Sequence, residues 1–159
     1  MATIRLARGA DADRCAALTA EALAAVHDAR GGDLFTRREV GLLAKALLRP
    51  GGLDRLLADP RRRIVVAAAD DGTVVGVAVG RVDPVGEAAL GVIDALYVAP
   101  PARATRIGRA LLDDLLGWFR ISNCRGVDAS ALPGDRAAKS FFEAEGFKGR
   151  LITMHRPLP

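Results

Sequence analysis

The sequence has few of the residues on which several common classes of protein depend. Its 159 residues include two cysteines, one tryptophan, one tyrosine and five phenylalanines. Cys15 and Cys124 have no CxxC spacing and no neighbouring histidine, which favours reduced structural thiols over a metal site or a disulfide framework. So few aromatic side chains also leave little to stack on the bases of a nucleic acid. We therefore expect a globular protein without a metal.

Long apolar runs are missing as well. The longest, Ile64 to Ala69, is far too short to span a bilayer, and Met1 to Leu6 has none of the apolar core of a signal peptide. Half of the residues are apolar and 26% are charged, which is ordinary for a globular chain. We expect one cytoplasmic domain over residues 1–159, with no membrane partner.

The charge is modestly positive. The formal net charge is +4 and the isoelectric point is about 9.7, which suits an anionic ligand or weak association with nucleic acid. The basic residues are scattered, however, and the only dense run is Arg61 to Arg63. Because that run precedes an apolar strand, we interpret it as the solvated start of the strand. A nucleic-acid function rests on the isoelectric point alone, so no specific nucleic-acid partner is expected.

Hydrophobic periodicity predicts an α/β fold. A hairpin is expected where Asp70-Asp71-Gly72 joins two strands, since Asp-Gly supplies the positive φ of a tight turn. A hairpin followed by strands that alternate with helices predicts a mixed sheet covered by helices. The expected strands are 3–8, 64–69, 73–82, 90–98, 127–132 and 148–156, and the expected helices are 11–31, 37–49, 53–58, 106–120 and 135–145.

The joint between a strand and a helix, from Val98 to Leu112, carries three arginines and a glycine. The first N–H groups of a helix are unpaired and lie at the positive end of its dipole, so they can hold a phosphate. Gly108 lets such a group approach the backbone, and Arg103 and Arg109 can add charge-assisted hydrogen bonds. The alternative is a tight helix-on-strand contact at Gly108 beside solvated arginines. No GxGxxG or GxxxxGK[ST] motif is present, which removes support for dinucleotide and P-loop sites.

Three segments together resemble one family. Leu96 to Leu112 resembles the acetyl-CoA signature of the GNAT superfamily of N-acetyltransferases, [QR]xxGx[GA]: Arg103 fits its first position and Gly108 its last, while Arg106 replaces the middle glycine. Asp135 to Phe147 resembles the second signature of the family, and Ile4 to Ala12 resembles its first strand and helix start. The resemblance covers nearly the whole chain.

The resemblance implies a single-domain fold with a mixed, mostly antiparallel sheet of six to seven strands, flanked by about four helices, whose fourth and fifth strands splay apart. It also implies transfer of an acetyl group from acetyl-CoA to a primary amine of a small molecule or peptide, by direct attack in a ternary complex. The pantetheine arm would bond to backbone of the fourth strand and the pyrophosphate would sit on the loop. The residues implied in coenzyme binding are Leu96, Tyr97, Val98, Arg103, Ala104, Thr105, Arg106, Ile107, Gly108, Arg109, Asp135 and Phe142.

Two residues depart from the family pattern. Arg106 is sterically tolerable with a negative φ, which we expect, whereas a positive φ would strain it. Phe142 stands where the family often has a tyrosine that is proposed to protonate the departing thiolate. Water, Ser140 or Tyr97 can replace that proton donor, and Phe142 itself then packs under the coenzyme. A non-catalytic acyl-CoA-binding module is the alternative that Phe142 motivates.

Asp94 is the candidate catalytic base. It interrupts an apolar strand, where a carboxylate is costly unless it is solvated or paired. A period of two places Asp94, Leu96 and Val98 on one face. Related transferases often carry at this position a carboxylate that accepts the proton of the amine through water, and a salt bridge within the sheet is the alternative role. His27 and His155 are weaker candidates.

Other charges have local explanations. Asp135 follows Pro133-Gly134 and is expected to be a helix N-cap. Arg136 and Lys139 are expected to be exposed helix charges, although both could meet coenzyme phosphates. The sequence leaves the oligomeric state open, although an exposed strand edge near the C-terminal end could pair with a second copy to form a homodimer.

Overall fold

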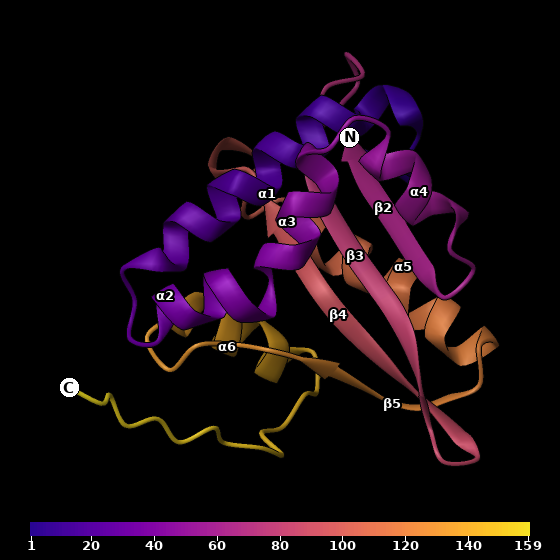
Figure 1. Cartoon of the computed structure of the whole chain (residues 1–159). Coiled ribbons are helices and arrows are strands. Elements are labelled where there is room, and N and C mark those ends of the chain that lie inside the picture. Colours follow the sequence, from indigo (N-terminus) through magenta and orange to yellow (C-terminus); the bar gives the residue numbers. More distant parts are fainter.

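A five-stranded sheet forms the centre of the molecule. The computed structural model describes residues 1–40 and 42–159, and its strands follow one another in the order β1-β2-β3-β4-β5 (Figure 1). Neighbouring strands are antiparallel except β4 and β5, which are parallel. The strands are β1 (Thr3–Leu6), β2 (Arg62–Ala68), β3 (Val74–Val85), β4 (Ala88–Val98) and β5 (Cys124–Ala129).

Helices cover both faces of the sheet. The helices α1, α3 and α4 lie on one face, and α5 and α6 lie on the other (Figure 1). A short π-helical stretch, η2 (Phe35–Glu39), links α2 to α3, and 3₁₀ turns η1 (Gly9–Asp11) and η3 (Pro100–Ala102) precede α1 and α5. The α-helices are α1 (Ala12–His27), α2 (Gly32–Leu34), α3 (Gly41–Leu48), α4 (Gly52–Ala58), α5 (Ile107–Ile121) and α6 (Arg136–Ala144).

The strand β2 explains why the core has two halves. Its side chains alternate between the faces, so that Ile64 and Val66 pack with α1, α3 and α4, while Val65 and Ala67 pack with α5. All four are fully buried, which accounts for the unbroken apolar run in the sequence. Burying one such valine or isoleucine side chain contributes about 1.5–3 kcal/mol.

The strongest sequence patterns are found where they were expected. The hairpin from β2 to β3 is confirmed, with Gly72 at a φ of +85°. The helix expected over 106–120 is α5, and its large apolar residues other than Ile121 pack on the sheet face that α5 covers. Six α-helices are present rather than about four. Helix α4 lies where a short helix was expected over 53–58, and the three-residue α2 in the irregular segment after α1 was not expected.

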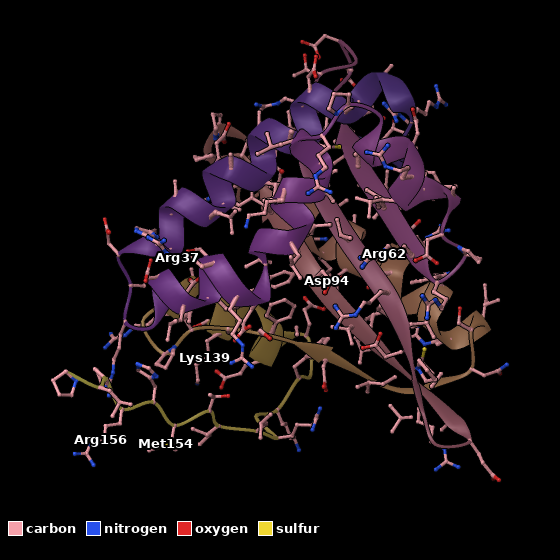
Figure 2. The ribbon with its side chains drawn as sticks, in the orientation of Figure 1. Arg37, Arg62, Asp94, Lys139, Met154 and Arg156 are labelled. Carbon is pink, nitrogen blue, oxygen red and sulfur yellow. The ribbon has the colours of Figure 1, made fainter. Side chains whose placement is uncertain are left out.

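The expected last strand was wrong. Residues 148–159 form no helix or strand and are exposed, so the sheet has five strands and not six or seven. Figure 2 shows Met154 and Arg156 of this segment away from the sheet. The segment is tied to β5 through an ion pair of Arg150 with Asp128 but makes no strand pairing with it. A strand-like pattern forms a strand only where a partner pairs with it. The strand expected over 127–132 begins earlier, at Cys124, because β4 reaches down to Ala88 and pairs there with β5.

Two irregularities divide β4 at its middle. In its pairing with β3, Val79 is opposite Ala95 and Gly80 is opposite Ile93, so Asp94 is an extra residue that forms a β-bulge. On the other side, pairing with β5 ends where Ile93 meets Ala129. Beyond that point β4 continues to Val98 with no partner strand on this side in the described part of the chain. The fourth and fifth strands therefore part, as the resemblance implies.

Candidate functional site: an open strand edge and a donor-rich loop

The C-terminal half of β4 presents backbone groups at an open edge. The N–H of Ala99 donates to the carbonyl oxygen of Val75 at 2.8 Å, so the backbone groups of Leu96 and Val98 point away from β3. No strand receives them, because the pairing with β5 ends at Ile93. Arg103 reaches this edge from the following loop, and its Nε donates to the carbonyl oxygen of Val98 at 3.0 Å.

The loop between β4 and α5 has a strained backbone. Ala104 and Arg106 both have a φ of +63°, in the left-handed region that favours glycine. Our expectation of a negative φ at Arg106 was therefore wrong. The chain leaves η3 and turns into α5 within four residues, and it uses two left-handed residues to do so. For a residue with a side chain this conformation costs about 1–2 kcal/mol.

The same loop carries a run of free hydrogen-bond donors. Within the described residues, no acceptor binds the backbone N–H groups of positions 104–109. Ala110 is the first residue of the helix whose N–H group has an acceptor: it donates to the carbonyl oxygen of Arg106 at 3.0 Å. Six consecutive N–H groups at the positive end of a 15-residue helix form a strong site for an anion.

The three arginines of the loop differ in their surroundings. The Arg103 guanidinium lies 5.3 Å from the centre of the Tyr97 ring. The side chain of Arg106 is exposed and forms no ion pair or hydrogen bond with the described residues. Arg109 is directed away from the loop, since its Nε lies 3.7 Å from a carboxylate oxygen of Glu145 at the end of α6. The hydroxyl of Thr105 donates to the carbonyl oxygen of Ala102 and so closes the turn.

Gly108 is not required by packing. A Cβ at this position would lie 3.5 Å from Cε2 of Phe141 and 3.8 Å from Cγ2 of Val98, which are ordinary van der Waals distances. The alternative of a tight helix-on-strand contact therefore loses its support. Phe141 beside the loop was missed by the sequence analysis, although its place in an apolar pair of α6 was a usable signal.

Phe142 belongs to an aromatic cluster. Its ring lies 5.3 Å from that of Phe141 and 5.2 Å from that of Phe147, both in edge-on arrangements. The three rings pack against the core on the face of α5. Asp135 begins the same helix, and its Oδ1 accepts a hydrogen bond from the N–H of Ala138 at 3.1 Å, which confirms it as the N-cap.

Asp94 does not share a face with Leu96 and Val98, contrary to our expectation. Those two residues pack with Ile93 on the face of α5, whereas Ala95 and Tyr97 pack on the opposite face. The bulge inserts one residue into β4 and so breaks the alternation. The side chain of Asp94 turns to the face where β2 and β3 present arginines, and Figure 2 shows it near Arg62 in front of the strands.

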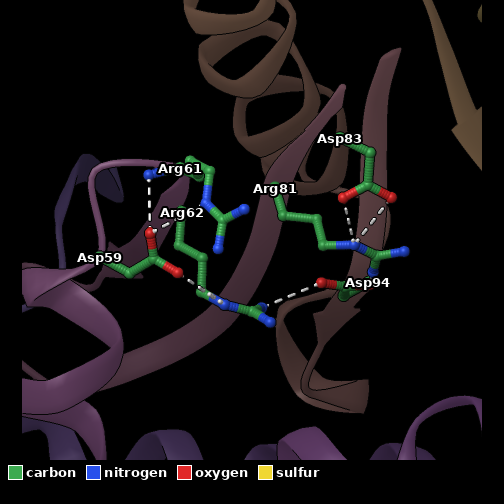
Figure 3. A network of polar contacts seen from close by, with 6 residues as sticks. All are labelled: Asp59, Arg61, Arg62, Arg81, Asp83 and Asp94. Carbon is green, nitrogen blue, oxygen red and sulfur yellow. Dashed lines mark hydrogen bonds and ion pairs between the residues drawn. The ribbon is translucent and has the colours of Figure 1, made fainter. Parts of the chain in front are cut away.

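Two arginines hold the Asp94 carboxylate. Nη1 of Arg62 donates to its Oδ2 at 3.2 Å, and Nη1 of Arg81 donates to its Oδ1 (Figure 3). The side chain of Asp94 is 13% exposed. Asp83 also pairs with Arg81, at 3.0 Å. Burial lowers the pKa of Arg81, but its contacts with Asp83 and Asp94 outweigh this and the net pKa is raised. The salt bridge that we considered as an alternative role of Asp94 is therefore present.

The run Arg61 to Arg63 is only partly a solvated strand start. Arg61 is exposed, but Arg62 joins Asp94 on one face of the sheet and Arg63 joins Asp114 of α5 on the other. Alternation along β2 separates the two neighbours. These partners lie 32 and 51 positions away, so no local pattern indicates them.

The remaining candidates lie outside this region or have structural roles. His27 is 3.3 Å from the hydroxyl of Thr36, and His155 is in the exposed C-terminal segment. Burial raises the pKa of the Cys15 thiol to about 11, which suits an inert core thiol. Among the described residues no group of three or more histidine, cysteine or acidic side chains could hold a metal ion. None of the helices described is both long and apolar enough to cross a membrane.

Comparison with known proteins gives the family. The model of the acetyltransferase (GNAT) family matches residues 33–147. An aminoglycoside N(6')-acetyltransferase of Stenotrophomonas maltophilia is 30% identical over 113 residues, which are 67% of this chain and 74% of that protein.

Solved structures share the fold. A mutant protein of Bacillus halodurans has a TM-score of 0.82 at 20% identity, covering 99% of both chains. The aminoglycoside N-acetyltransferase AAC(6')-Iy, solved in complex with CoA, has a TM-score of 0.71 at 18% identity, covering 99% of this chain and 96% of the other. Because the family model matches well over half of the sequence, including the donor-rich loop and α6, the chain belongs to the acetyltransferase (GNAT) family.

Proposed function

We propose that the protein transfers an acetyl group from acetyl-CoA to a primary amine of a small molecule or peptide. The observation that carries this proposal is the run of free N–H groups at positions 104–109, directly beside the open edge of β4. An amine acceptor is supported by the similarity to an aminoglycoside N(6')-acetyltransferase. Acetyl-CoA as co-substrate is supported by the fold that the chain shares with a protein solved in complex with CoA.

The proposed roles of the coenzyme-binding residues follow from their backbone groups. The N–H groups from Ala104 to Arg109 bind the pyrophosphate, and the exposed Arg106 adds its charge. The pantetheine arm extends along the edge of β4, where Leu96 and the N–H of Val98 offer hydrogen bonds. Tyr97 and Arg103 hold the loop against this edge. Asp135 and Phe142 shape α6 behind it.

Direct attack requires a carbonyl that is polarised and an amine that loses its proton. We assign the first task to the N–H donors of β4 near Leu96 and Val98. The amine nitrogen bonds to the thioester carbon, the carbon–sulfur bond breaks, and the amine proton passes through water to Asp94. Each carboxylate oxygen accepts from one arginine and retains a further acceptor position for that water. Water, Ser140 and Tyr97 remain the alternatives for protonating the thiolate.

Substitution of Gly108 by alanine tests the coenzyme site. Alanine fits the structure without a clash but adds a methyl group beside Phe141 and Val98, where the coenzyme has to approach the backbone. We expect the wild type to bind acetyl-CoA and coenzyme A with micromolar affinity and ATP much more weakly, measured by isothermal titration. Gly108→Ala is expected to weaken both coenzyme affinities at least about tenfold, which is 1.4 kcal/mol.

Gly117→Ala is the matched control, because it lies in the same helix with open space around its Cβ position. It should leave coenzyme binding unchanged. Equal affinities of the two variants would remove the loop from the site. Tight binding by the wild type without turnover of any amine in a broad panel would instead favour the non-catalytic acyl-CoA-binding module.

We also propose that two copies associate through the segment after Phe147. Leu151, Ile152, Met154 and Leu158 are 74–87% exposed, and β5 beside them is an edge strand. Light scattering after gel filtration should give a dimer for the wild type and a monomer for Ile152→Asp. Ile121→Asp, at an equally exposed isoleucine of α5, should stay dimeric. A monomeric wild type would exclude the dimer.

A further inference from the structure

In the polar network around Asp94, the arginines have more N–H donors than the neighbouring carboxylates accept. Arg62 of β2 is directly opposite Arg81 of β3, so both side chains project from the same face of the sheet. The bulge at Asp94 turns a carboxylate of β4 between them (Figure 3). Three strands thus bring two guanidinium groups to one point.

Each guanidinium has one unused end. Arg62 donates from Nη1 to Asp94, and its Nε lies 3.7 Å from an oxygen of Asp59. Arg81 donates from Nε to Asp83 and from Nη1 to Asp94. Neither Nη2 group has an acceptor among the described residues. The two side chains are 26% and 33% exposed, so a ligand can reach these donors.

We infer that Arg62 and Arg81 bind a carboxylate group of the amine acceptor through their Nη2 groups. This inference rests on the proposed function, which places the reacting amine beside Asp94. Both guanidinium groups contact Asp94 through Nη1, and the N–H groups of a guanidinium match the planar, two-oxygen geometry of a carboxylate. The acceptor is then an amine that carries a carboxylate close to its nitrogen, as α-amino acids do.

The charges of the network favour such an acceptor over a polycation. Asp59, Asp83 and Asp94 are balanced by Arg61, Arg62 and Arg81, so there is no surplus of negative charge to attract several ammonium groups. An acceptor with one amine and one carboxylate finds the complementary pair: Asp94 for the amine and the Nη2 groups for the carboxylate. Specificity then arises from the Nη2 donors that any acceptor without the carboxylate leaves without a partner.

Paired acceptors test the inference. Each pair consists of an α-amino acid and its α-carboxamide, and kcat/KM is measured for both with saturating acetyl-CoA. The ratio of the two values is compared between variants, so that differences in amine reactivity cancel. We expect the wild type to prefer the carboxylate, and Arg81→Gln to reduce that ratio about 30-fold, the effect of losing one charge-assisted hydrogen bond. Arg62→Gln should act in the same direction.

Arg61→Gln is the matched control, because the side chain of Arg61 is 69% exposed and, among the described residues, pairs only with Asp59. It removes the same charge from the same strand end and should leave the ratio unchanged. If Arg81→Gln lowered kcat/KM equally for both acceptors, the inference would be overturned and Arg81 would be a structural residue. A wild type that does not prefer the carboxylate would also overturn the inference.

A titration of acetyl-CoA into each variant separates this failure from that of the proposed function. Coenzyme binding with turnover of amines that lack a carboxylate contradicts only the acceptor inference. If no amine is acetylated, binding of N-acetyl amino acids is compared with that of their carboxamides, and equal or absent binding overturns the inference as well.

Discussion

Arg103 donates from Nε to the carbonyl oxygen of Val98 at 3.0 Å and thereby ties the loop before α5 back onto the end of β4. The contact links the two parts of the proposed coenzyme site: Val98 ends the open edge, and Arg103 immediately precedes the run of free N–H donors at positions 104–109. The guanidinium also lies 5.3 Å from the centre of the Tyr97 ring. The loop is therefore held in place before any ligand arrives.

Replacing Arg103 by glutamine should loosen this loop. The lost charged hydrogen bond and the lost contact with Tyr97 should together weaken acetyl-CoA binding about tenfold, as measured by isothermal titration. Arg120→Gln, at an exposed position near the other end of α5, removes the same charge and should have no effect. If both variants lost affinity equally, net charge rather than the contact with Val98 would be responsible.

The positive φ of Arg106 gives a prediction about stability. Glycine adopts this conformation freely, so Arg106→Gly should raise the free energy of unfolding by about 1 kcal/mol, and the melting temperature by about 2–4 °C. Arg109→Gly, three residues later and inside α5, should lower the free energy of unfolding by about 1 kcal/mol. Thermal and urea unfolding measure both variants, and we expect the two changes in the free energy of unfolding to have opposite signs. A loss of stability in both would show that the loop does not strain Arg106.

Local patterns were sufficient to predict most elements of the fold. The hairpin at Gly72 and the apolar face of α5 depend on a few adjacent residues, and both are found where the sequence indicates. The strand expected over 148–156 depends on a partner strand, which no local pattern can supply. The sign of φ at Arg106 depends on how tightly η3 and α5 are joined, so it too could not be derived locally.

The candidate site was predictable where backbone forms it and not where side chains from several strands meet. Gly108 and the loop are contiguous in sequence and could be identified. The surroundings of Asp94 depend on a bulge that exists only once β3 and β4 pair, and its partners Arg62 and Arg81 come from two other strands. Alternation alone therefore placed Asp94 on the wrong face.

Asp94→Asn tests the proposed base. The substitution preserves shape but removes the negative charge, so we expect kcat to fall about 100-fold while the affinity for acetyl-CoA is unchanged. Asp83→Asn is the control, since it removes a carboxylate that pairs with the same Arg81. It should reduce kcat much less. Catalysis that survives unchanged in Asp94→Asn would remove Asp94 from its role and leave it as the anchor of two arginines.

The pair of Arg5 and Asp11 predicts how stability depends on pH. Nη1 and Nη2 of Arg5 donate to the two carboxylate oxygens at 2.7 and 2.9 Å, and the N–H of Arg8 donates to the same group at 2.8 Å. These hydrogen bonds, that of Arg5 above all, lower the pKa of Asp11 below its usual 3.8, against the opposing effect of burial. Because the folded-state pKa lies below the unfolded one, the stabilisation is fully present above about pH 4 and is lost as the pH falls through the folded-state value.

Asp11→Asn should therefore lower the free energy of unfolding by about 2 kcal/mol at pH 7, measured by urea unfolding. The deficit relative to the wild type should persist at pH 5 and shrink as the pH falls below about 4, as the wild type itself loses the carboxylate charge. Asp13→Asn, at an exposed position two residues later with no ion pair in the described residues, should cost less than about 1 kcal/mol. A deficit at Asp11 that stayed constant down to pH 2 would mean that shape, and not the charge of the carboxylate, holds Arg5 and the start of α1 together.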